Sequence, residues 1–183
     1  MRRQAIVSLL CSAIGLIGST GLASADMVGR YECSIVGPSI PEPVGDRADH
    51  TIQSVQYSCV GVDGLLKGAA MTGNAVVEWQ GPKSTFLAAS TTHRTPGGLA
   101  VGQLLEGNGS IVMKDGRPLG QDASGKATIK FASGTLASLS GKTLKWTSKP
   151  VSFNRFEQEY SSESRWTKPP MCCGGGHTTP QYL

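Results

Sequence analysis

The chain has 183 residues, a formal net charge of +4 with neutral histidines, and only 6% aromatic residues. A balance this mild, without any run of Lys and Arg backed by aromatic residues, lacks the electrostatic pattern of a nucleic-acid-binding surface. We therefore expect no nucleic-acid partner.

The N-terminus has the pattern of a secretory signal peptide. Arg2 and Arg3 form a short basic start, residues 5–18 are apolar, and Ala23-Ser24-Ala25 fits the small-x-small cleavage motif. We expect cleavage before Asp26 and export to the periplasm or out of the cell. The alternative is a membrane anchor, but the apolar stretch is shorter than the roughly 20 residues that cross a bilayer. No later segment is long enough to span as a helix.

Four cysteines follow the signal region, namely Cys33, Cys59, Cys172 and Cys173. Three pairings are possible, and the sequence alone does not choose among them. Cys33 and Cys59 both lie in strand-like runs, so we predict a disulfide between them. In an oxidising compartment, closing this loop of about 27 residues contributes roughly 3 to 4 kcal/mol. The alternative is a pair of buried thiols.

Short strands and turn residues follow one another along the chain. Residues 31–36 read as a strand, and the proline-rich residues 37–49 read as a long loop. Val55, Tyr57 and Cys59 alternate with polar residues, and Asp63-Gly64 predicts a hairpin turn into a strand over residues 65–80.

The second half continues in the same way. We expect strands over residues 84–94, 99–106, 110–114, 121–132, 142–147 and 151–160. Gly107-Asn108-Gly109 and Asp115-Gly116 predict turns between them. Ala127, Ile129 and Phe131 alternate with polar residues and should share the buried face, while Leu136 and Leu139 fit one helical turn. Pro150 should end its strand, and Phe153 and Phe156 should anchor the last one.

Eight or nine short strands without an amphipathic helix predict an all-β fold. Sequential hairpins, glycines inside long strands and small residues on the inner faces favour a small antiparallel up-and-down β-barrel of about eight strands. A β-sandwich is the alternative. The barrel domain should cover residues 26–160, and residues 161–183 have the composition of a flexible tail.

Residues 131–142, Phe-Ala-Ser-Gly-Thr-Leu-Ala-Ser-Leu-Ser-Gly-Lys, resemble a segment of the barrels related to allene oxide cyclase and the dirigent proteins. In those families a strand leads through a Gly-Thr-Gly-like turn and an apolar helical turn to the next strand. Here Leu136 replaces the second glycine, and none of the families' catalytic residues align. The resemblance implies an eight-stranded barrel with an apolar cavity, and it transfers no activity. The chain is also similar to uncharacterised exported bacterial proteins.

Two groups of residues are candidates for binding. A cavity for an apolar ligand would be lined by Tyr57, Met71, Trp79, Phe131 and Trp146; a packed interior is the alternative. His93 and Arg94, near a strand end, suit an anion or a carbonyl, but neighbours on a strand face opposite sides, so only one can point inward.

The remaining chemistry is sparse. Glu78 and Glu106 are two carboxylates, but nothing in their spacing brings them together. Cys172, Cys173 and His177 are potential ligands for copper or zinc, at most in an open site. Motifs for nucleophilic hydrolysis, metalloproteases and phosphate loops are missing, so no cofactor is expected.

These observations support three hypotheses. The leading one is a non-catalytic exported barrel that binds a small apolar or amphipathic ligand or acts through surface contacts. The second is an isomerase or cyclase with an apolar barrel cavity. The third is an envelope interaction protein or inhibitor that uses the loop over residues 37–49.

Overall fold

The structure is a computed structural model and describes residues 26–162. Its elements in chain order are β1 (Met27–Ile35), β2 (Glu42–Pro43), β3 (His50–Gly64), β4 (Ala70–Gln80), β5 (Lys83–Thr95), β6 (Gly98–Lys114), β7 (Arg117–Gly134), the 3-10 helix η1 (Ala137–Leu139), β8 (Thr143–Ser152) and β9 (Arg155–Ser162). The predicted signal peptide and most of the predicted tail lie outside the described residues. Residues 161 and 162, which we assigned to the tail, belong to β9.

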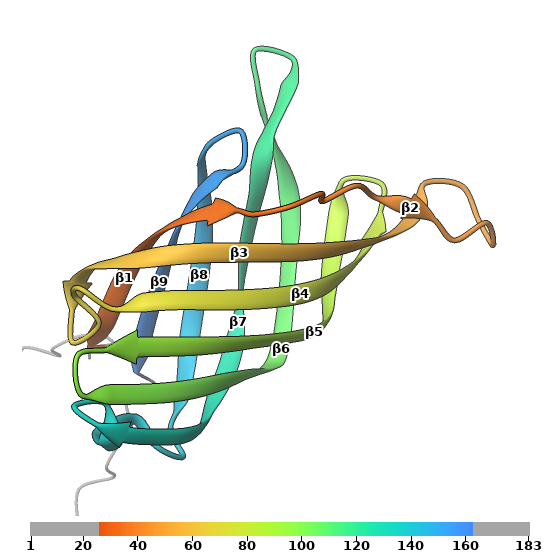
Figure 1. Cartoon of the computed structure of the whole chain (residues 1–183). Helices are drawn as coiled ribbons and strands as arrows, with labels where there is room; N and C mark the ends of the chain where they lie inside the picture. The colour runs from red at the N-terminus through yellow and green to blue at the C-terminus, as the bar shows by residue number, and fades with distance from the viewer. Residues whose placement is uncertain (1–25, 163–183) are drawn as a thin grey trace, which may run out of the picture.

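Eight of the strands form a closed barrel (Figure 1). From β3 to β9 each strand pairs antiparallel with the next, and β1 closes the ring by pairing with both β9 and β3. The short β2 lies outside this ring and pairs only with the start of β3. The prediction of an eight-stranded antiparallel barrel is confirmed, and the sandwich alternative is wrong. No helix among residues 26–162 is long and apolar enough to cross a membrane.

Two predictions about turns are wrong. We predicted that a strand starts directly after Asp63-Gly64, but β4 begins only at Ala70, and residues 65–69 fold over the barrel end with Leu66 buried. We also predicted a turn at Gly107-Asn108-Gly109, whereas β6 runs through it without a break. The two glycines there face inward, where a Cβ on Gly107 would meet the Trp146 ring at 2.6 Å. They make room for side chains instead of turning the chain.

The prediction that Phe131 faces the barrel interior is wrong. Val101 pairs with Phe131 and Gly102 with Ile129, so Lys130 is an extra residue in β7 and forms a β-bulge. The bulge reverses the alternation after Ile129, which is buried, and Phe131 is 71% exposed on the outer wall. One inserted residue is enough to move every later side chain to the other face.

The last hairpin also differs from the prediction. Pro150 lies inside β8 and does not end it. The β7–β8 pairing stops at Ala123 and Ser148, so no ladder partner on that side needs an N–H from Pro150. The chain then reverses at Phe153 and Asn154, and Phe153 is 79% exposed at the turn. The predicted core anchor Phe153 is therefore a surface residue, while Phe156 packs against the core.

The disulfide between Cys33 and Cys59 is present at the seam where β1 closes the barrel. The two residues are direct cross-strand partners with their Cα atoms 4.0 Å apart, and both are buried. The bond therefore links the first strand of the barrel to the second inside the wall, which confirms the predicted pairing.

One end of the barrel is filled by side chains. Residues of the β3–β4 turn, of η1 and of the adjacent strand ends pack together there, including Tyr31, Leu66, Met71, Ile129, Leu136 and Leu144, each at most 1% exposed. The first and last described residues, Asp26 and Ser162, lie at this end as well: the Ser162 N–H donates to the Asp26 carbonyl, and nearby Gly29 pairs with Gly64 at the β3–β4 turn. We call it the closed end. The loop before β3 and the β4–β5, β6–β7 and β8–β9 turns surround the other end.

Candidate functional site

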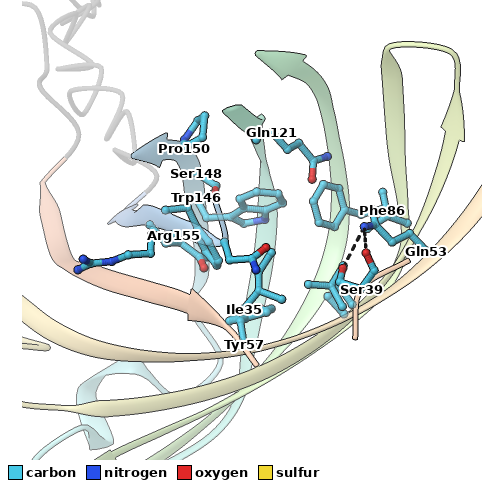
Figure 2. Close-up of a pocket in the computed structure, with 18 of the residues that line it drawn as sticks. Ile35, Ser39, Gln53, Tyr57, Phe86, Gln121, Trp146, Ser148, Pro150 and Arg155 are labelled. Carbon is cyan, nitrogen blue, oxygen red and sulfur yellow. Dashed lines mark hydrogen bonds between the residues drawn. The ribbon is translucent and has the colours of Figure 1, made fainter. Parts of the chain in front are cut away.

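A cavity of about 530 Å³ occupies the barrel interior and opens at the end opposite the core (Figure 2). Inward-facing residues of every barrel strand contribute to its wall. The apolar members include Val55, Ala75, Val77, Trp79, Phe86, Ala89, Leu104, Ile111, Ala127, Trp146 and Phe156. The alternative of a fully packed interior is therefore wrong. Small residues on the inner faces keep this volume open, because an eight-stranded barrel is just wide enough for larger side chains to fill it.

Aromatic rings form the main apolar surface. Trp146 and Phe86 meet edge to face with their ring centroids 5.2 Å apart, and both are visible in Figure 2. Nearer the mouth, Trp79 donates from Nε1 to Gln53 Oε1 at 2.8 Å, and Gln53 Nε2 donates to Ser39 Oγ at 2.9 Å. Two successive side-chain hydrogen bonds thus hold the loop after β1 against the inner wall.

The deep end of the cavity carries neutral polar groups. Gln158 Nε2 donates to the Tyr160 hydroxyl at 2.9 Å, and that hydroxyl faces Met71 Sδ at 3.7 Å. Thr91 Oγ1 lies 3.0 Å from a ring nitrogen of His93. Burial raises the pKa of Tyr160 well above its usual value, so its hydroxyl keeps its proton at physiological pH.

Tyr57 differs from its neighbours because its hydroxyl has no hydrogen-bond partner among residues 26–162. The ring is 9% exposed, lies over Gly73 and meets Phe156 edge to face. Burial raises its pKa to about 12. A protonated, unpartnered phenol facing a cavity can both donate and accept a hydrogen bond to a ligand.

His93 lies beneath the cavity floor and does not line it. Its Nδ1 is 2.8 Å from the Tyr31 hydroxyl and its Nε2 contacts Thr91, so both ring nitrogens have partners. Burial lowers the pKa of His93 to about 4, and the imidazole is therefore neutral at pH 7. Arg94 is exposed and points away. As predicted for adjacent strand residues, the pair is divided between the two faces, and it cannot act together on one anion.

The only charged residue at the cavity wall, within the part of the chain described, is Arg155 at its mouth. It is exposed and precedes the inward-facing Phe156 in β9, so its side chain belongs to the outer face. The cavity itself is consequently lined by apolar and neutral polar side chains.

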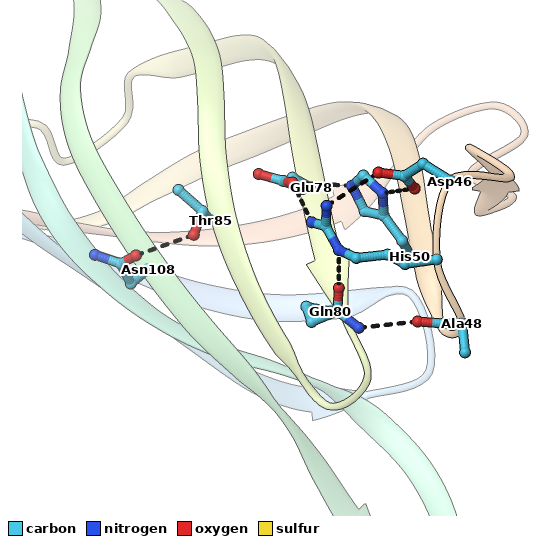
Figure 3. A network of polar contacts seen from close by, with 8 residues as sticks. Asp46, Ala48, His50, Glu78, Gln80, Thr85 and Asn108 are labelled. Atoms are coloured by element: carbon cyan, nitrogen blue, oxygen red, sulfur yellow. Dashed lines mark hydrogen bonds and ion pairs between the residues drawn. The ribbon is translucent and has the colours of Figure 1, made fainter.

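A separate polar cluster holds the loop at the outer wall near the mouth (Figure 3). His50 contacts Asp46 through Nδ1 and Glu78 through Nε2, the latter at 2.9 Å, while Arg47 bridges Asp46 at 3.0 Å and Glu78 at 3.1 Å. The hydrogen bond with His50, aided by the charges of His50 and Arg47, lowers the pKa of Asp46. Since every carboxylate here is paired, we interpret the cluster as a clip for residues 46–50.

The predicted site residues fall into three groups. Tyr57, Trp79 and Trp146 line the cavity, whereas Met71 is buried in the closed-end core and Phe131 lies outside the barrel. Both were predicted as lining residues, and the structure corrects them: Met71 lies too close to the filled end, and the bulge turns Phe131 outward.

The other predicted chemistry is not assembled. Glu78 belongs to the clip, and Glu106 lies 3.5 Å from Lys126, so they form no carboxylate pair. Cys172, Cys173 and His177 are outside the described residues; within 26–162 no group of three potential ligands could hold a metal.

The sequence analysis missed Phe86, Gln158 and Tyr160 as site residues. The alternation of Phe156, Gln158 and Tyr160 in the last strand was a usable signal, because their polar neighbours Glu157 and Glu159 occupy the opposite face. Phe86 had no such signal, since Leu87 forms a bulge directly after it.

Fold and site together define a small closed β-barrel with a one-ended internal cavity of ligand size. No known protein family, curated protein or solved structure matches the chain. The resemblance to allene oxide cyclase and dirigent barrels therefore stays a prediction.

Proposed function

We propose that the protein binds a small, uncharged, amphipathic molecule inside the barrel. The observation that carries this proposal is the open-ended cavity of about 530 Å³, which falls in the range of small-molecule sites. Rings, aliphatic side chains and a few hydrogen-bonding groups line it, as in sites that fix one orientation of a mostly apolar ligand.

The cavity chemistry argues for a neutral ligand. A carboxylate or ammonium brought inside would lose its hydration without meeting an opposite charge, which is costly. A hydroxyl or carbonyl group could instead reach the Tyr57 hydroxyl near the floor. The apolar part of the ligand would then lie along Trp146 and Phe86, toward the mouth.

Binding is supported over the isomerase or cyclase alternative. Acid-base catalysis needs a group whose pKa lies near the working pH. Burial moves the pKa values of Tyr57 and Tyr160 upward, and His93, whose pKa is lowered, is separated from the cavity by Thr91. The proposed location remains the periplasm or the cell exterior, supported by the signal-like N-terminus and the disulfide between Cys33 and Cys59.

The test compares two neighbouring alanines of β5. Ala89 lines the cavity, whereas Ala88 is exposed on the outer wall. Ala89→Trp should fill part of the cavity and weaken binding of a neutral apolar dye such as Nile red, because the indole occupies volume that the dye needs. Ala88→Trp should leave the affinity unchanged. Fluorescence titration gives both values, and circular dichroism confirms the fold of each variant.

Native mass spectrometry of the wild-type protein provides an independent measurement, because it does not depend on a folded variant. A co-purifying neutral molecule, displaced by the dye, would support the proposal and identify the ligand class. Equal dye affinity in both tryptophan variants would contradict it, as would dye binding that no competitor displaces.

A further inference from the structure

The rim of the cavity exposes large apolar side chains to solvent, and one of them, Phe153, also borders the cavity mouth. Phe153 is 79% exposed at the β8–β9 turn, Val151 is 57% exposed beside it, and Met113 is 56% exposed near the tip of the β6–β7 hairpin. Isolated exposed apolar residues are ordinary, but large ones gathered around an opening often mark a contact site.

The two hairpins lie side by side. Gly120 of β7 approaches the Pro150 ring of β8 so closely that a Cβ on it would be 2.7 Å away. In Figure 1 the β6–β7 hairpin projects beyond the barrel, and the β8–β9 turn lies next to it. We call the residues 113–118 and 149–155 the mouth hairpins.

The mouth hairpins are also basic. They contain Lys114, Arg117, Lys149 and Arg155 against the single carboxylate of Asp115. None of these four cations has an ion-pair partner within the described part of the chain, although Lys149 is the cross-strand neighbour of Glu157, which binds Arg30. Across the mouth, the loop over residues 37–49 has an acidic excess, so charge favours contact through the hairpins and not through the whole rim.

We propose that the mouth hairpins dock on the surface of an anionic lipid bilayer. Exposed apolar side chains next to unpaired cations fit this partner, because the apolar groups enter the boundary of the acyl chains while Lys and Arg meet the headgroups. Docking in this orientation brings the hairpin side of the cavity opening to the bilayer surface. This gives the ligand of the proposed function, on which this step rests, a short path between lipid and barrel.

The experiment uses vesicle flotation of the protein in its cellular form, whose N-terminus is first determined by mass spectrometry. Vesicles consist of phosphatidylcholine alone or mixed with phosphatidylglycerol. The wild-type protein should bind the mixed vesicles, and binding should weaken as salt is added. Removing both arginines of the mouth hairpins, Arg117→Gln with Arg155→Gln, should lower the affinity roughly 5-fold for each cation. Phe153→Ser should lower it roughly 10-fold.

The outer wall supplies a matched control. Phe131 is 71% exposed and follows the exposed Lys130, but both lie near the closed end. Phe131→Ser with Lys130→Gln removes the same kinds of groups and should leave vesicle binding unchanged. All variants are checked by thermal unfolding, which should equal that of the wild type. The control variant should also keep the wild-type dye affinity, because Phe131 and Lys130 lie outside the cavity.

Several outcomes would overturn the proposal. One is that neither vesicle binds the wild-type protein; another is that the control variant loses as much binding as the mouth variants. A third is that Phe153→Ser leaves vesicle binding unchanged but abolishes association between copies of the protein. The rim would then be a protein–protein interface. Vesicle binding with an unoccupied cavity would leave this proposal standing and count against the proposed ligand, so the two can fail separately.

Discussion

The same strands run through both ends of the barrel, but one end is packed with side chains and the other encloses a cavity. At the closed end Leu66, Leu136 and Ile129 are at most 1% exposed and fill the interior. At the open end the inner positions hold Ala75, Ala89 and Ala127, and a cavity remains. The closed end is solid because Leu66 of the β3–β4 turn and Leu136 beside η1 fold into it, whereas small residues on the strands leave space between the rings at the other end. The closed end should therefore carry stability, and the open end binding.

The largest effect should come from truncating the closed-end core. Leu66→Ala removes a side chain that is 1% exposed and packs directly on Gly29, so it should lower the free energy of unfolding by about 2 to 5 kcal/mol. Ile111→Ala, at the cavity wall, should cost about 1 kcal/mol, because its side chain already borders open space. Urea unfolding measures both losses, and equal losses would remove the distinction between the ends.

Acid should destabilise the closed end through His93. The unfolded state takes up a proton below the ordinary histidine pKa of 6.5, but the folded state does so only near 4. Stability from the neutral His93 is thus complete above pH 6.5 and falls as the pH drops toward 4, by up to about 3 kcal/mol.

His93→Gln retains groups that can bond to Tyr31 and Thr91 but does not titrate. Its unfolding free energy should depend less on pH between 6.5 and 4 than that of the wild type. The difference between the two curves isolates His93 from His50, which is present in both proteins. Parallel curves would mean that His93 has no such role.

The smallest effect should come from Tyr57→Phe near the cavity floor. Its hydroxyl has no protein partner within residues 26–162, so removing it should barely change stability. Binding of a ligand that carries a hydroxyl or carbonyl should weaken by about 1 kcal/mol, roughly 5-fold, while binding of a pure hydrocarbon should not change. Calorimetry with such a ligand pair separates the two cases. A large loss of stability would show that the hydroxyl supports the fold.

The sequence predicted the architecture because alternation and turn residues are local signals. Met71, Ala75, Val77 and Trp79 face inward as their spacing indicates, and Asp115-Gly116 forms its turn with positive φ at both residues. The disulfide followed from two strand-like runs with one cysteine each.

The failures have one physical origin. A bulge such as that at Lys130 adds one residue to a strand without a recognisable local sequence pattern. This one places Phe131 on the outer face of the barrel. Likewise Gly107 looked like a turn residue, because the reason for its missing side chain is Trp146, about 40 positions away in the sequence. The cavity depends on such distant neighbours, so its existence and its floor could not be derived from the strands themselves.

Gly107 has a consequence for selectivity. A methyl group at this position would press on the Trp146 indole and on Phe86, whose Cβ lies 3.3 Å from the site of the added carbon. Since both rings line the cavity, any shift that relieves the contact would change the shape of the lumen. Under the proposed function, a substitution at Gly107, which does not itself line the cavity, would therefore change which ligands fit.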